Sequence, residues 1–440
     1  MKTARITAAI LALCLCFVLS GCSVFTVDTE ELMSPPELTG DMYPISKALT
    51  KSVKGEYRLK YPSSGDQRSA IVLEDIDSDG RKEAFAFYST SDDEMTNMHI
   101  NAIVLDGEDY TSVGDQSIVA GGVERIDFCD LNGDGIKEIL VGWEVYGLSE
   151  KQICVYALED NTFSQLISER YSGYVCCDLS GNGKNELLIH LLNTVDAVNT
   201  ATLYTLENTT PKKIGSCVLD GSVKSVSTPA VSSLSTGQTA VYIDEIKGAG
   251  AITEILFYAG GELKNPLLGT ENTLENNKTL RSASINCRDI DADGALEVPI
   301  ATVLPNAAGT EELLYYTNWC AFDGQKFETR LITVVNSVDG YYLEIPNELA
   351  NRLAVVKDTE NHRRVLYYYD KETESVGSRI ATVSVVSAED FDSSNTPGAF
   401  ELGRSGNSVF TGSVSPAANA PIDEAKLKTM FKINTPEVKR

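Results

Sequence analysis

Basic residues are scarce in this 440-residue chain, where 37 Lys and Arg stand against 63 Asp and Glu for a formal net charge of −26. Affinity for nucleic acid comes mainly from Lys and Arg that neutralise phosphates, so we expect no nucleic-acid partner. Histidine is rarer still, with three residues, and none has the H-E-x-x-H spacing of a metalloprotease. Phosphate-loop, dinucleotide-binding and serine-hydrolase motifs are also missing. The sequence therefore shows no catalytic constellation and predicts that the protein is not an enzyme.

Long apolar runs are lacking except near the N-terminus, at residues 8–19. This run has the length of a signal peptide's apolar region and is too short to span a bilayer. It ends in Leu19-Ser20-Gly21-Cys22, which resembles the lipobox of bacterial lipoproteins. The resemblance implies that residues 1–21 are a signal peptide and that Cys22 carries a lipid holding the protein outside the cytoplasm, on the bacterial cell membrane. The alternative is a plain secretory signal. Residues 22–40, acidic and Pro-containing, predict a flexible tether.

Paired cysteines are not evident either. Of ten Cys, two lie in the predicted signal peptide and one is Cys22, which leaves an odd number without any C-x-x-C spacing. This pattern argues against a disulfide framework and against a zinc site. Several of the remaining cysteines directly precede a repeated acidic loop, so we interpret them as small buried residues of equivalent strands.

What the chain does contain is a repeat. A nine-residue pattern begins with Asp, has polar side chains at positions three and five, Gly at position six and Glu at position nine. It starts at Asp75, Asp130, Asp178 and Asp289, and a decayed copy starts at Ser233. Successive starts are 48 to 56 residues apart. Short runs rich in β-branched and aromatic residues flank each loop and predict four strands per repeat, the size of a propeller blade.

These loops and their period resemble the FG-GAP/VCBS repeats of integrin-α-like β-propellers. The resemblance implies that a calcium loop joins the first two strands of each blade. It predicts an all-β-dominated fold in which residues 41–335 form a calcium-loop β-propeller, with about five to seven four-stranded blades in the whole chain.

The loop chemistry suits calcium, which takes six to eight oxygen ligands and needs a Gly where the loop turns sharply. An EF-hand is excluded because position twelve falls inside an apolar strand in every copy. The loops at 75 and 289 each have four carboxylates, the loop at 130 has three and the loop at 178 has two. We therefore predict three to four structural Ca²⁺ sites, the weakest at Asp178, and none at Ser233. The predicted ligands are Asp75, Asp77, Asp79 and Glu83; Asp130, Asn132, Asp134 and Glu138; Asp178, Ser180, Asn182 and Glu186; and Asp289, Asp291, Asp293 and Glu297.

The acidic loop disappears after residue 335, while strand patterns continue. Near the end, Asp423 precedes Leu427 and Met430 at helical spacing, which predicts a terminal helix. We predict a small α+β module over residues 336–440; the alternative is two further blades.

Fold, acidity and export together predict a monomeric binding or scaffold module for a protein or glycan at the cell envelope. The alternative function is that of a propeller-type polysaccharide hydrolase or lyase, because carboxylates are too numerous for sequence alone to show which of them pair.

Overall fold

A computed structural model describes residues 42–90, 97–145, 151–192, 199–269, 275–282, 284–305, 313–391, 398–416 and 421–434. The predicted signal peptide, the lipid site Cys22 and the tether lie outside these ranges. Within them, no helix combines the length and apolar character needed to cross a membrane.

The described chain is all-β, with six antiparallel sheets and two α-helices. In the second and third sheets, the four strands pair in the order in which they follow one another in the chain, as in the blades of a propeller. The first sheet contains β1 (Tyr57–Leu59), β2 (Ile71–Glu74), β3 (Glu83–Thr90), β4 (Asn97–Asp106) and β5 (Asp109–Val119). The second contains β6 (Gly122–Cys129), β7 (Glu138–Glu144), β8 (Lys151–Glu159) and β9 (Thr162–Tyr171), and the third contains β10 (Gly173–Cys177), β11 (Glu186–Leu191), β12 (Asn199–Glu207) and β13 (Thr210–Leu219).

The later sheets carry additional strands. The fourth sheet contains β14 (Ser225–Val226), β15 (Ala230–Ser233), β16 (Thr239–Lys247), β17 (Gly250–Ala259), β18 (Glu262–Lys264) and β19 (Arg281–Ser282). The fifth contains β20 (Val298–Val303), β21 (Tyr315–Phe322), β22 (Phe327–Asn336), β23 (Tyr341–Glu344) and β29 (Phe431–Ile433). The sixth contains β24 (Leu353–Asp358), β25 (Arg363–Asp370), β26 (Ser375–Ser387), β27 (Ala399–Ser405) and β28 (Ser408–Val414). The predicted strands flanking the acidic loops are thus confirmed.

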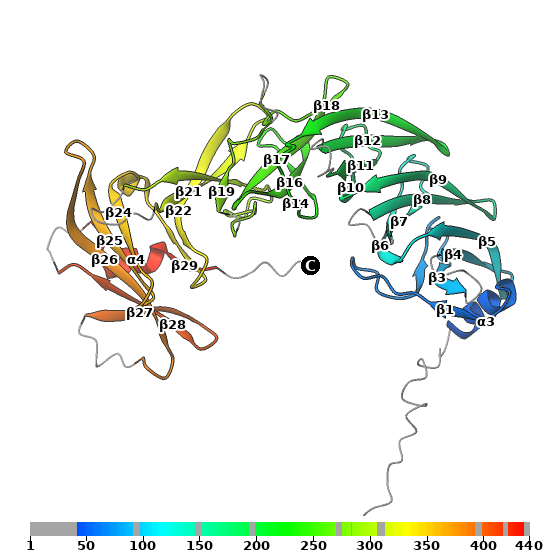
Figure 1. Ribbon diagram of the computed structural model, residues 1–440, viewed down its shortest axis with the longest axis horizontal. Coiled ribbons are helices and arrows are strands. Elements are labelled where there is room, and N and C mark those ends of the chain that lie inside the picture. Colours follow the sequence, from blue (N-terminus) through cyan, green and yellow to red (C-terminus); the bar gives the residue numbers. More distant parts are fainter. Residues whose placement is uncertain are drawn as a thin grey trace, which may run out of the picture.

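The sheets follow one another along an arc, with the first and sixth at opposite ends (Figure 1). A separate apolar core fills each junction between neighbours. Between the first and second sheets, for example, Phe87 of β3 and Trp143 of β7 are fully buried with ring centroids 6.0 Å apart. Because strand side chains alternate between faces, each of the first five sheets contributes to a core on both of its faces.

Helix α3 (Met42–Ser52) covers the face of the first sheet that has no neighbouring sheet (Figure 1). Its buried residues Ile45, Ala48 and Leu49 pack on Ala84 and Ala86, whereas the intervening Phe85 points into the next junction. The sequence analysis did not predict this helix. The spacing of these three apolar residues, which lie on one helical face, was the overlooked signal.

The C-terminal residues continue the fifth sheet and build the sixth. Strand β23 pairs with β22 on one side and β29 on the other, so residue 336, where we predicted a separate module to begin, is the last residue of β22. The terminal helix is confirmed as α4 (Glu424–Met430), whose cap Asp423 accepts a hydrogen bond from the N–H of Lys426. It buries Leu427 and Met430 between the fifth and sixth sheets.

Candidate metal centres

Three of the four acidic loops join two neighbouring antiparallel strands, and the fourth leads into the first strand of a sheet. The loops at 75, 130 and 178 connect β2 to β3, β6 to β7 and β10 to β11. The loop at 289 leads into β20 and is closed by a β-bridge between Arg288 and Glu297. The decayed copy is the turn from β15 to β16, so it occupies the equivalent place in the fourth sheet. The repeat found in the sequence therefore corresponds to one position in successive sheets.

The four loops share the same internal hydrogen bonds. In each, the first Asp accepts a bond from the N–H of the Gly at position six, with distances of 2.9 to 3.0 Å. The Glu at position nine accepts one from the N–H of the residue after that Asp, at 2.8 to 3.1 Å. Carboxylates at both ends thus hold each loop closed. Among the described residues, three predicted ligands come together in the loop at 75 and three in the loop at 289, without Asp79 and Asp293, and no such acidic group forms in the loops at 130 and 178.

Backbone conformation explains the glycine at position six. In the loop at 75, Gly80 has φ of 87°, in the left-handed region that side chains disfavour. Position four also has positive φ, yet it is Ser78 in this loop and Ala292 in the loop at 289. The closed loop imposes this conformation even where glycine is missing.

The loops differ in how their carboxylates are satisfied. Three oxygens, one each from Asp75, Asp77 and Glu83, lie within 4.8 Å of one another, and the same holds for Asp289, Asp291 and Glu297. Buried carboxylate oxygens in both groups lack any hydrogen-bond partner, namely Oδ1 of Asp75 and Oε1 of Glu297. A divalent cation would supply what these oxygens lack.

In the other two loops, neutral side chains occupy that place. Asn132 donates to Asp134 at 2.8 Å and, at 3.4 Å, to Oε1 of Glu138. In the loop at 178, Ser180 and Asn182 donate to Oε1 of Glu186 at 2.5 and 3.1 Å. The neutral side chains that replace carboxylates in these two loops also donate hydrogen bonds to the glutamate at position nine. This agrees with the lower calcium affinity predicted for these loops.

Burial raises the pKa of three of the glutamates at position nine, Glu83, Glu138 and Glu297. Burial raises the pKa of Glu138 and that of Glu297 to about 7. A backbone hydrogen bond opposes this shift, and the neighbouring aspartates add to it. Burial also raises the pKa of Glu83. Since a bound cation favours the ionised form, calcium would reverse these shifts.

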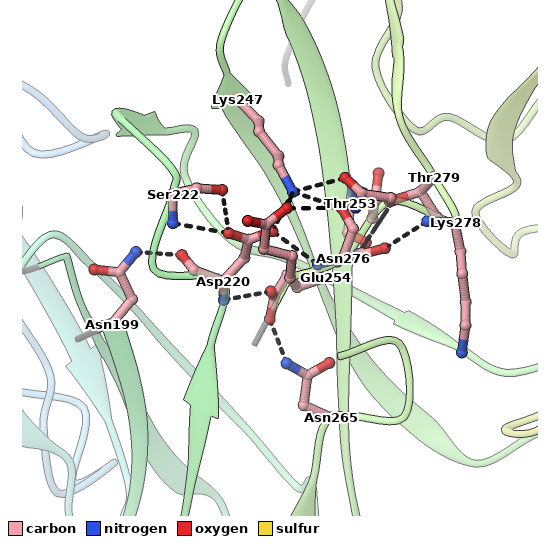
Figure 2. A network of polar contacts seen from close by, with 12 residues as sticks. Asn199, Asp220, Ser222, Lys247, Thr253, Glu254, Asn265, Asn276, Lys278 and Thr279 are labelled. Carbon is pink, nitrogen blue, oxygen red and sulfur yellow. Dashed lines mark hydrogen bonds and ion pairs between the residues drawn. The ribbon is translucent and has the colours of Figure 1, made fainter. Parts of the chain in front are cut away.

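A second group of polar residues lies at the other end of the strands, between the third and fourth sheets (Figure 2). Asp220 is fully buried, and its side chain accepts bonds from Lys247 Nζ at 2.9 Å and from the N–H of Asn276 at 2.8 Å. Glu254, also fully buried, accepts from the N–H of Asp220 and from Asn265. Sequence analysis missed this network.

The network explains two opposite pKa shifts. Burial acts to raise the pKa of Asp220, but hydrogen bonds from Ser222 and Lys247 outweigh it and hold that pKa below its usual value. Burial dominates at Glu254 and raises its pKa to about 7. Nearby, His190 and Glu245 face each other with Nε2 and Oε1 3.3 Å apart, both fully enclosed. His190 is thus enclosed within strand β11.

Comparisons with known proteins do not show a family. No protein-family model and no curated protein matches the chain. Among solved structures, a rhamnogalacturonan lyase from Bacillus licheniformis has a TM-score of 0.31 and 9% identity, over 66% of this chain and 81% of that one. A periplasmic gluconolactonase from Pseudomonas aeruginosa has a TM-score of 0.29 and 10% identity, over 74% of this chain and 95% of that one. Likenesses at this level carry no argument about function.

Proposed function

We propose that this protein is a calcium-stabilised, propeller-like scaffold that binds a protein or glycan at the outer face of a bacterial cell membrane. Each sheet counts as one blade, which gives six, and the acidic loops are repeats of the FG-GAP/VCBS type. The observation that carries the proposal is the recurrence of one closed acidic loop at the same position of successive sheets, with unpartnered carboxylate oxygens in two of them.

The acidic loop recurs at the same position of successive sheets, and the geometry of the sheet is what those positions share. This favours a structural role for the metal. Neighbouring loops are also linked to each other. Lys184, in the loop at 178, donates to the backbone oxygen of Asn132 at 2.8 Å, and the N–H of Lys137 donates to the oxygen of Ile76 at 2.8 Å. A cation that orders one loop would therefore also stabilise its junction with the next.

Successive sheets in an arc offer an extended concave side, which repeat proteins commonly use for binding. The fully enclosed carboxyls with raised pKa, Glu245 and Glu254, are 1% and 0% exposed, so a substrate has no access to them. We therefore favour a binding function over that of a polysaccharide hydrolase or lyase. In this proposal the protein is a monomer and binds no nucleic acid.

The test is a pull-down and glycan-array screen of the purified protein, once with calcium and once with chelator. The proposal is supported if a protein or glycan binds in calcium and no longer binds in chelator. It is overturned if the protein turns over any glycan. Anchoring is tested separately by replacing Cys22 with Ala, which should release the protein from the membrane fraction.

A further inference from the structure

Basic residues gather at the start of the described chain. Residues 47–60 contain one acidic residue and five of the 37 Lys and Arg, which we call the basic face: Lys47, Lys51, Lys54, Arg58 and Lys60. This segment is therefore positively charged in a protein whose formal net charge is −26. It contains the second half of helix α3 and all of β1, which lie at one end of the arc (Figure 1).

The packing of helix α3 turns its basic residues outward. The three buried residues of the helix face the first sheet. Residues four apart lie on one side of a helix, and Tyr43, Lys47 and Lys51 form such a row on the side opposite the buried residues. All three are exposed, and Lys54, just after the helix, is exposed as well.

Strand β1 extends this surface beyond the helix. The hydroxyls of Thr50 and Tyr57 lie 3.0 Å apart, which holds the strand beside the helix. Within β1, Arg58 is exposed, whereas Tyr57 and Leu59 pack against the core beneath α3. A cleft of about 690 Å³ is lined by Thr50 of the helix and by Arg58 and Lys60, among others. Helix and strand thus present their cations on one continuous part of the first sheet.

The charges of the basic face are not neutralised within the protein. None of its residues forms an ion pair with another described residue. Other exposed cations do pair with an acidic neighbour, as Lys212 does with Glu207 and Arg404 with Glu401. The field of five clustered cations is therefore available to an anionic partner.

The surface of a membrane is the anionic partner that fits best. Each Lys or Arg close to anionic headgroups strengthens binding about fivefold. Tyr43 and Tyr61, which are 64% and 60% exposed, flank the basic segment, and tyrosine is favoured in the headgroup region. Met42 follows the predicted lipid site Cys22 by 20 residues, and a chain of that length reaches at most about 70 Å. The basic face therefore stays near any membrane to which Cys22 is anchored.

We propose that the basic face binds anionic lipid headgroups, so that helix α3 and strand β1 lie on the membrane. The inference rests on the proposed location at a membrane. It adds to the lipid anchor a second contact, which fixes the end of the arc that meets the bilayer.

Vesicle sedimentation tests the basic face without the lipid anchor. The protein used is the chain from residue 23 onward, which keeps every described residue. It should bind vesicles of mixed phosphatidylglycerol and phosphatidylcholine at least about tenfold more tightly than vesicles of phosphatidylcholine alone. Raising the salt concentration from about 0.05 M to about 0.5 M should remove the difference, because salt screens exposed charges.

A triple variant locates the binding surface. Lys47→Gln, Lys51→Gln and Lys54→Gln together should weaken binding to the anionic vesicles at least about tenfold. The three side chains are exposed, so the fold should be unchanged, which circular dichroism checks.

A matched control separates the position of the charges from their number. Lys212→Gln, Lys264→Gln and Lys371→Gln together remove three exposed lysines from later sheets and change the net charge equally. This control should bind anionic vesicles as the unaltered chain does. Equal losses in the two triple variants would mean that net charge alone governs binding, and would overturn the inference.

Three other results would also overturn the inference. They are equal binding to the two kinds of vesicle, unchanged binding of the Lys47, Lys51 and Lys54 variant, and tighter binding to a DNA duplex than to anionic vesicles. The second would indicate that calcium bridges acidic residues to the lipid.

The outcome is separable from that of the proposed function. Anchoring of the full chain through Cys22 is measured after a wash in high salt, where the basic face no longer binds. Loss of anchoring in Cys22→Ala, without vesicle binding by the unlipidated chain, would leave the proposed anchor standing and remove this inference. Vesicle binding through the basic face, with no protein or glycan captured, would support this inference and remove the scaffold function.

Discussion

The two edges of the sheets deal with acidic side chains in opposite ways. At the loop edge, Asp79 pairs with Arg81 at 2.6 Å, but one carboxylate oxygen in each of two loops, Oδ1 of Asp75 and Oε1 of Glu297, has no partner among the described residues. At the other edge, Asp220 is buried just as deeply but is paired with Lys247 and held by backbone donors (Figure 2). Two acidic groups at one edge could therefore be completed by a cation from the solvent, whereas those at the other edge are completed by the chain's own donors.

This difference predicts which part of the protein loses stability when calcium is removed from the solution. Chelation should affect the loop edge alone, and loss of a single basic residue should affect the opposite edge alone. Four experiments, ordered by the size of the expected effect, separate the two.

Lys247→Met should have the largest effect. It leaves Asp220 and Glu254 buried without their nearby cation, and we expect a loss of about 3 kcal/mol in the free energy of unfolding, with or without calcium. Urea denaturation measures this loss. The control is Lys212→Met, which breaks an exposed pair with Glu207 and should leave the free energy of unfolding essentially unchanged. Equal losses in the two variants would show that the network adds nothing.

Calcium binding should stabilise the protein by about 2.7 kcal/mol per saturated site at a concentration one hundred times the Kd. Asp289→Ala should remove one bound Ca²⁺ in a calorimetric titration, because it breaks a group of three carboxylates. The matched variant Asp178→Ala should leave the number of tightly bound ions unchanged. Loss of as much calcium from Asp178→Ala would contradict the order of affinities.

In chelator, the two corresponding glutamates should behave differently. Glu186→Gln loses bonds from Ser180 and from the N–H of Leu179, so we expect a cost of about 1 to 2 kcal/mol in unfolding free energy. Glu297→Gln removes a charge near three aspartates, keeps an oxygen that can accept from the N–H of Ile290, and should be neutral or stabilising because Oε1 has no partner among the described residues. Thermal unfolding of both variants in chelator measures the difference, and similar costs would mean that the loops are equally satisfied without metal.

The smallest effect is a pH dependence of stability. Because burial raises the pKa of Glu254 from 4.5 to about 7, the folded state holds this proton more tightly than the unfolded state. The contribution of Glu254 is therefore fully present below pH 4.5 and is lost as the pH rises through 7. Glu254→Gln should flatten the fall in stability between about pH 5 and 7.5, on the order of 1 kcal/mol. An unchanged slope would show that Glu254 ionises normally.

How much of the structure could be predicted from the sequence depends on how far apart in the chain the interacting residues lie. Each loop was predictable because its ligands lie within nine residues and its flanking strands alternate. The opposite network was not, because Asp220, Glu254 and Asn276 come from different elements and occupy no repeated position. Similarly, nothing local to Arg288 signals that Trp319 and Tyr342 enclose it, since pairing across the fifth sheet brings them together.

Helix α3 has a further consequence for how such a chain can change in length. It fills the face of the first sheet that another sheet would otherwise cover. In a closed ring, gaining or losing one unit alters the angle between all the others. Here the two ends do not meet (Figure 1), so a duplicated unit inserted between existing junctions needs only to match its two neighbours. The loops start at unequal intervals along the chain, and the copy at Ser233 has decayed. Independent units can accumulate differences of this kind.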